Sequence, residues 1–163
     1  MRSISITLAL IIAASAASAQ QSAPPTKTYS SAADVAGLLA KAKSEHKDQP
    51  TVIENILRLA PYSANLEYRT AVGPASVHER EAEMFYVLEG SGTLVTGGKL
   101  VGEKRNNAEN LGGTAIEGGS SQAVAKGDVV IVPENTPHWF SVINGTLVLM
   151  SLHVPRTSAG GTH

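Results

Sequence analysis

Residues 73–90 read GPASVHEREAEMFYVLEG, and residues 127–138 read GDVVIVPENTPH. The first segment places His78 and Glu83 just before an apolar run, and the second places His138 just after one. Short apolar runs bounded by Gly, Pro and Asn are typical of β-strands. These three side chains can meet only if the strands fold into one barrel, and two imidazoles with a carboxylate would then form a metal site.

The two segments resemble the two sequence motifs of the cupin superfamily over roughly residues 60–154. Glu83 and Gly90 match the second half of the first motif, and His78 takes the place of its second histidine. The second motif keeps its glycine, proline and histidine as Gly127, Pro133 and His138.

The chain departs from both motifs. Ser76 stands where the first motif has its first histidine; if His78 is read as that residue instead, Arg80 takes the second place. One imidazole is lost in either register. In the second motif, Asn135 replaces the usual glycine and Val142 replaces the asparagine.

The resemblance implies an all-β fold, a cupin-type antiparallel β-barrel or jelly roll. Outside it, one N-terminal amphipathic helix is predicted because Val35, Leu38, Leu39 and Ala42 would share one helix face. The resemblance also implies a divalent metal ion held by His78, Glu83 and His138, with coordination positions left open. Fe, Mn, Zn, Ni or Co suits that ligand set. Because such barrels often pair, we also expect a homodimer.

The spacing of the first two ligands needs a turn. His78 and Glu83 are five residues apart, so on one unbroken strand they would face opposite sides of the sheet. The charged run Glu79-Arg80-Glu81 favours solvent and supplies the turn. If the register slips by a turn, Glu79 and Glu81 are alternative carboxylate ligands.

Other residues are assigned to the surroundings of the site. Arg80 is a candidate for binding a substrate carboxylate through its planar guanidinium. Tyr86 would reach the cavity with its hydroxyl if Phe85 faces the helix. His153 ends the last strand, where a supporting or rim position is expected, and His46 is expected on the surface.

The N-terminal sequence predicts export. Arg2, the apolar run 4–14 and Ala17-Ser18-Ala19 are the three regions of a secretory signal peptide, cleaved after Ala19. We therefore expect a periplasmic or secreted protein without a membrane anchor after cleavage. The chain has no cysteine and a net charge of -1, which excludes a disulfide framework and gives no basic surface for nucleic acid.

The predicted domains are the signal peptide (1–19), a leader with the amphipathic helix (20–50), the cupin barrel (51–155) and a flexible tail (156–163). Ser31 and Asp34 predict the helix start. A turn that links two short strands is predicted at 89–92, and a tight hairpin is predicted at the Asn144-Gly145 dipeptide. The polar segment 97–121 is expected to border the cavity, with Leu100-Val101 pairing with Thr114–Ile116.

These features favour a metal-dependent enzyme that acts on a small oxygen-bearing organic molecule by oxygenase, lyase or isomerase chemistry. The alternative is a non-catalytic exported module that binds or senses a small molecule or a metal, and the loss of one imidazole favours it. A small molecule is the expected partner in both cases.

Overall fold

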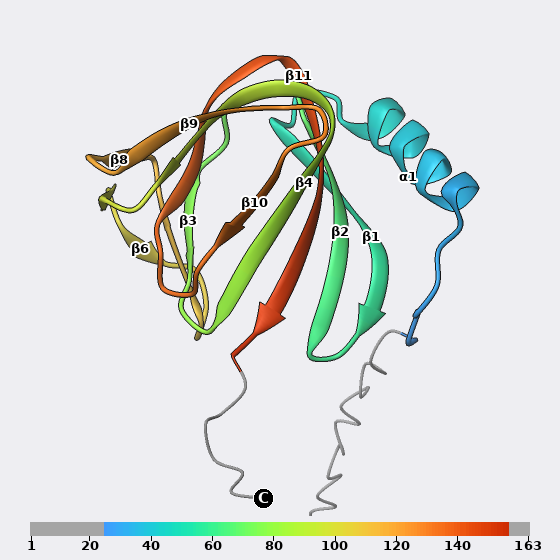
Figure 1. The fold of residues 1–163 in the computed structure, drawn as a ribbon, viewed down its shortest axis with the longest axis horizontal. Coiled ribbons are helices and arrows are strands. Elements are labelled where there is room, and N and C mark those ends of the chain that lie inside the picture. Colours follow the sequence, from blue (N-terminus) through green and yellow to red (C-terminus); the bar gives the residue numbers. More distant parts are fainter. Residues whose placement is uncertain (1–24, 157–163) are drawn as a thin grey trace, which may run out of the picture.

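The computed structural model describes residues 25–156, so the predicted signal peptide and residues 157–163 lie outside the described residues. Within that range the chain forms one helix followed by eleven strands (Figure 1). The elements are α1 (Ala32–Glu45), β1 (Thr51–Leu59), β2 (Tyr62–Arg69), β3 (Ala75–His78), β4 (Glu81–Thr96), β5 (Lys99–Val101), β6 (Lys104–Arg105), β7 (Asn110–Gly113), β8 (Ala115–Glu117), β9 (Ser120–Ala125), β10 (Val129–Val132) and β11 (His138–Pro155).

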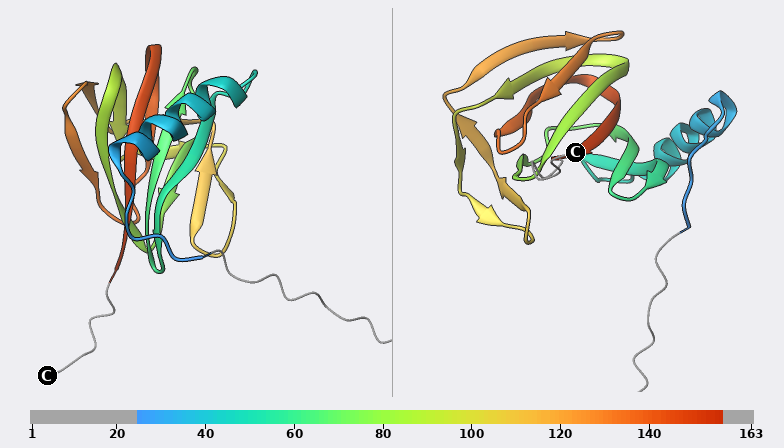
Figure 2. Two further views of the ribbon diagram at one scale, coloured as in Figure 1. Left: turned by 90° about the vertical axis from the view of Figure 1, so that its right-hand side faces the viewer. Right: turned by 60° about the horizontal axis from the view of Figure 1, so that its bottom comes forward.

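The strands form a nine-stranded antiparallel sheet and a separate two-stranded sheet, β5-β8. In the main sheet the order is β1-β2-β11-β3-β7-β6, while β4 pairs with β11, β10 and β9. The sheet curls round an interior, as Figure 2 shows from below. This arrangement is the jelly roll, and it confirms the predicted fold class.

Helix α1 begins where the sequence predicts it because Ser31 and Asp34 form a capping box. The Ser31 hydroxyl accepts a hydrogen bond from the Asp34 N–H (3.1 Å), and the Asp34 carboxylate accepts one from the Ser31 N–H (2.8 Å). The helix lies outside the sheet beside β1 and β2 (Figure 1), as expected.

Apolar side chains of the described residues gather in two clusters, one on each face of the sheet. The inner cluster contains Phe85, Val87, Leu94, Val124, Val132, Phe140, Leu147 and Leu149. The outer cluster lies under the helix and contains Ala42, Ile56, Ala64, Leu66, Tyr68 and Val148. Alternate residues of β2 face opposite sides, so Leu66 joins the outer cluster while Glu67 faces a cavity.

Both predicted strand breaks are wrong. Strand β4 continues through 89–92, and β11 continues through the Asn144-Gly145 dipeptide. The two strands pair on both sides of this point, where their register shifts. Gly90 has a φ of 81°, and a Cβ there would overlap the carbonyl oxygen of Thr146. Glycine is therefore required where these two paired strands bend and their backbones come close together.

Segment 97–121 is largely ordered into strands, and its predicted internal pairing is confirmed. Leu100 lies opposite Ile116, and Val101 lies opposite Ala115, in the two-stranded sheet. In addition, β7 pairs with β3, which brings this excursion against the strand that carries His78.

The end of the predicted leader is attached to the sheet. Two backbone hydrogen bonds of 2.7 and 2.8 Å join Lys27 to Arg58 of β1. No helix within residues 25–156 has the length and apolar character needed to span a membrane.

Candidate metal centre

The three predicted ligands come together at one end of the sheet. His78 is the last residue of β3, Glu83 lies near the start of β4, and His138 opens β11. The Nε2 atoms of His78 and His138 lie 3.2 and 3.1 Å from the same oxygen, Oε2 of Glu83. The two imidazole centroids are 5.2 Å apart.

The required break lies between β3 and β4. β3 ends at His78 and β4 begins at Glu81, so the predicted turn is present and occupies Glu79 and Arg80. The Glu79 N–H donates to the carbonyl of Glu109 (2.9 Å), which holds this turn against the 97–121 excursion. The break lets residues with an odd spacing face the same interior.

The turn before His138 depends on Asn135. Its φ is 55°, in the left-handed region that glycine occupies most easily and asparagine next. The Asn135 N–H donates to the carbonyl of His78 at 2.7 Å. Asparagine therefore serves where the motif usually has glycine, and the turn ties the second motif to the first.

A third imidazole, that of His153 near the end of β11, joins the cluster. His153 lies directly opposite Glu83 in the β11–β4 register, and its Nε2 is 3.3 Å from Oε1 of Glu83. Its ring centroid is 4.9 Å from that of His78. Donor atoms of His78, Glu83 and His153 all lie within 4.8 Å of one another, a spacing that can hold an ion. The sequence assigned His153 only a supporting or rim position.

Each of the three imidazoles has an oxygen partner at Nδ1. His78 Nδ1 lies 2.6 Å from the amide oxygen of Asn110, and His138 Nδ1 lies 3.2 Å from the carbonyl oxygen of Thr136. His153 Nδ1 lies 2.8 Å from the carboxylate of Glu81. Since these oxygens accept hydrogen bonds, they assign the proton of each neutral ring to Nδ1 and leave a lone pair on Nε2.

This tautomer makes the centre suited to a cation. Three Nε2 lone pairs then face the two oxygens of Glu83, and acceptors facing acceptors repel one another unless a proton or a metal ion lies between them. Nitrogen and carboxylate donors are ligands of divalent transition metals, and Nδ1–H bonds to oxygen are the usual support of metal-binding histidines. The residues present therefore fit a divalent ion.

Burial and charge shift the acidities of the cluster. Burial alone would raise the pKa of Glu83, but hydrogen bonds to His138 and His78 outweigh it and hold that pKa well below 4.5. Burial likewise lowers the pKa of His78, yet the hydrogen bond and charge of Glu83, with help from Asn110 and Glu81, raise it above 6.5 overall. Without a metal, His78 therefore keeps its proton to a higher pH than a free imidazole does, and Glu83 stays ionised to a lower pH than a free carboxyl does.

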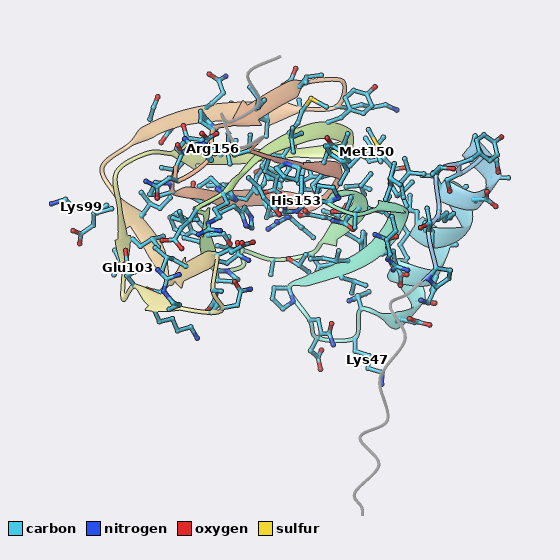
Figure 3. The ribbon with its side chains drawn as sticks, turned by 90° about the horizontal axis from the view of Figure 1, so that it is seen from below. Lys47, Lys99, Glu103, Met150, His153 and Arg156 are labelled. Atoms are coloured by element: carbon cyan, nitrogen blue, oxygen red, sulfur yellow. The ribbon has the colours of Figure 1, made fainter. Side chains whose placement is uncertain are left out.

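A cavity of about 250 Å³ opens onto the cluster. Its lining consists of Ile53, Asn65, Glu67, Arg69, Ser76, His78, Glu83, His138 and His153. Figure 3 looks up at this end of the molecule and shows His153 near the centre, whereas Lys47 and Lys99 lie at the periphery. The Arg69 guanidinium donates to the buried carboxylate of Glu67 and lies 4.8 Å from the Phe140 ring centroid.

The structure places several predicted residues away from this cavity. Arg80 is 76% exposed and lies 3.5 Å from Glu109, while Arg69 is the arginine in the cavity lining. Tyr86 is exposed because Phe85, its neighbour, packs in the inner cluster instead of facing the helix.

Three further assignments are corrected by the structure. Glu79 pairs with Arg105 (2.7 Å) outside the cluster. His46 is half-buried with its ring against Tyr68 (centroids 5.6 Å apart), not on the open surface. Among the described residues, segment 97–121 contributes none to the lining of the 250 Å³ cavity, although Asn110 supports His78 from behind.

Comparison with known proteins supports the fold. The family model described as Cupin matches residues 43–156. Solved structures of similar fold include TT1209 from Thermus thermophilus (16% identity, TM-score 0.50, covering 72% of this chain and 95% of that chain). Another is KdgF from Halomonas sp. (17% identity, TM-score 0.49, covering 68% and 84%). A search of curated proteins found no match.

Proposed function

This chain belongs to the cupin family, and we propose that it is a metal-dependent enzyme that acts on a small oxygen-bearing organic molecule. His78, Glu83 and His138 hold the divalent ion. The observation that carries this proposal is the set of oxygen partners at Nδ1, which turns the Nε2 lone pairs towards the carboxylate of Glu83. When bound, such an ion supplies Lewis-acid polarisation of a ligand oxygen.

The cavity supplies the binding site for the organic molecule. Asn65 and Arg69 bring amide and guanidinium groups to its lining, and Ile53 adds an apolar side chain. Two nitrogens of the Arg69 guanidinium, Nε and Nη2, already donate to Glu67, so Nη1 is the Arg69 group proposed to donate to a substrate oxygen. These side chains are better placed than Arg80 and Tyr86 to orient a substrate beside the ion. A cavity of about 250 Å³ restricts that substrate to a small molecule.

A non-catalytic binding or sensing module is the alternative function. The imidazole missing from the first motif at Ser76 favours this non-catalytic module, because fewer ligands hold a metal less tightly. Because His153 adds a third imidazole to the cluster, that reason no longer applies.

Metal content tests the proposal first. Freshly purified protein should contain one divalent ion per chain, and Fe, Mn, Zn, Ni and Co should be compared by reconstitution after chelation. The double variant His78→Ala, His138→Ala should lose the ion while keeping its β-sheet circular dichroism. The matched control is His46→Gln, which removes a histidine outside the cluster. Unchanged metal content in the double variant would contradict the assigned ligands.

Turnover separates the enzyme from the binding module. Reconstituted protein should convert small hydroxy, oxo or carboxylic acids by oxygenase, lyase or isomerase chemistry, and the double variant should not. Tight binding of such acids without conversion would favour the non-catalytic module.

Export and pairing are part of the same proposal. Mature protein from the native host should begin at Gln20, and its mass in solution should be twice that of one mature chain. Intact Met1 on an intracellular protein, or a monomeric mass at micromolar concentration, would contradict these two features respectively.

A further inference from the structure

We propose, building on the metal site proposed above, that His153 is a metal ligand that replaces the imidazole missing from the first motif. The ion would then be held by three imidazoles and Glu83, with the third imidazole supplied by the end of β11 in place of β3.

The position of His153 supports direct ligation. Its Nε2 lies 3.3 Å from Oε1 of Glu83, while His78 and His138 approach Oε2 of the same carboxylate. The three histidines therefore surround both oxygens of Glu83. The side chain of His153 is 19% exposed, the same as that of His78, and both residues line the 250 Å³ cavity.

Glu81 gives His153 the orientation that a ligand needs. Its Oε2 accepts a hydrogen bond from Nδ1 of His153 at 2.8 Å, which directs Nε2 inward. A carboxylate behind a histidine is a common support of metal ligands because it fixes the tautomer and raises the basicity of the ring. Glu81, the alternative ligand of the sequence analysis, is thus a positioning residue.

Ser76 stands at the place of the motif's first histidine, and its surroundings are consistent with a ligand supplied from β11 instead. Ser76 lies directly opposite His138 in the β11–β3 register and lines the cavity. A serine there leaves open the space that the motif's first imidazole would fill. Because the third imidazole comes from β11 and not from β3, the β3 side of the site has space for a substrate to approach the ion.

The test uses Zn²⁺ affinity of the full mature protein, measured by competition with a chromophoric chelator. His153→Ala should weaken binding by on the order of 100-fold or more, beyond the roughly 10–100-fold typical of supporting residues. Glu81→Gln should weaken it by about 10-fold. Adding Ser76→His to His153→Ala should restore much of the affinity, since an imidazole returns at the motif position. His46→Gln serves as the control.

The outcomes separate this inference from the proposed function. If the wild-type protein binds no Zn²⁺, the proposed metal site itself is wrong. If it binds Zn²⁺ and His153→Ala binds equally tightly, His153 is not a ligand and the site of His78, Glu83 and His138 stands.

A second measurement needs no substitution and covers the case in which His153→Ala does not fold. Electron spin echo spectra of the Cu²⁺-loaded wild-type protein count the coordinated imidazoles. Three are expected, and two would overturn the inference.

Discussion

Glu83 is the residue on which three imidazoles converge, and this arrangement sets the response of the metal-free protein to pH. The pKa of Glu83 is lowered from 4.5, so its contribution to stability is present above pH 4.5 and is lost as the pH falls. The pKa of His78 is raised from 6.5, so its contribution is complete below pH 6.5 and is lost as the pH rises through the folded-state value. Both contributions are complete between pH 4.5 and 6.5.

We therefore predict that chelator-treated protein has a higher Tm at about pH 5.5 than at about pH 8, as measured by differential scanning calorimetry. Added Zn²⁺ should reverse the trend, because metal binding requires deprotonated imidazoles and so stabilises more as the pH rises. In Glu83→Gln the decline of Tm above pH 6.5 should be smaller. A metal-free Tm that rises from about pH 5.5 to about pH 8 in the wild-type protein would contradict this prediction.

Asn135 allows a test of the turn that positions His138. Its φ of 55° costs a residue with a Cβ about 1–2 kcal/mol, a penalty that glycine avoids and asparagine reduces. Asn135→Ala should lower the free energy of unfolding by about 1 kcal/mol, while Asn135→Gly should change it by less than about half of that. Urea unfolding measures both. Equal losses in the two variants would show that the asparagine side chain, and not the backbone conformation, stabilises the turn.

Residue identities predicted part of the site. His78, Glu83 and His138 could be found because they lie beside apolar strands within recognisable motifs, and the structure brings them together. His153 could not be placed in the same way. It is fifteen residues from His138, an odd spacing that puts the two side chains on opposite faces of a regular strand. The register shifts in β11 reverse that parity, so both face the interior.

At the scale of elements, β4 and β11 are two long paired strands whose register shifts where both of them bend. Gly90 and Gly145 both have positive φ there, of 81° and 75°. They differ in their surroundings: a Cβ on Gly90 would overlap the Thr146 carbonyl, whereas one on Gly145 would meet nothing within 4 Å.

The two glycines therefore form a matched pair of substitutions. Gly145→Ala should cost about 1–2 kcal/mol of unfolding free energy from backbone strain alone. Gly90→Ala should cost clearly more, because the overlap forces the strands apart. Chemical denaturation of both variants measures the difference. Similar losses would mean that the strands can separate at this point without loss of pairing.

The elements were predictable where local signals decide the structure. Ser31 and Asp34 fix the start of α1 through bonds that span three residues. Glycine and asparagine, as found at 89–92 and 144–145, are favoured both in turns between strands and in bends within one strand, so local sequence does not distinguish the two. Their role here is set by the pairing of β4 with β11, a contact between distant parts of the chain that local sequence does not reveal.

For the whole molecule, the outer apolar cluster and the candidate metal centre lie on opposite faces of the sheet. Leu66 is fully buried in the outer cluster beneath the helix, whereas the next residue, Glu67, faces the cavity. Tertiary packing should therefore survive removal of the metal, in contrast to small metal-dependent domains that unfold without their ion.

This separation gives opposite expectations for two kinds of variant. Leu66→Ala should lower the unfolding free energy of chelator-treated protein by about 2–5 kcal/mol, as large cavities in packed cores do, while Zn²⁺ still binds at one ion per chain. His78→Ala, His138→Ala should remove Zn²⁺ binding and leave the β-sheet circular dichroism unchanged. Urea unfolding in chelator, together with metal analysis, measures both properties. If chelation alone abolishes the β-sheet circular dichroism of the wild-type protein, the fold depends on the ion. The outer cluster would then not be independent of the metal centre.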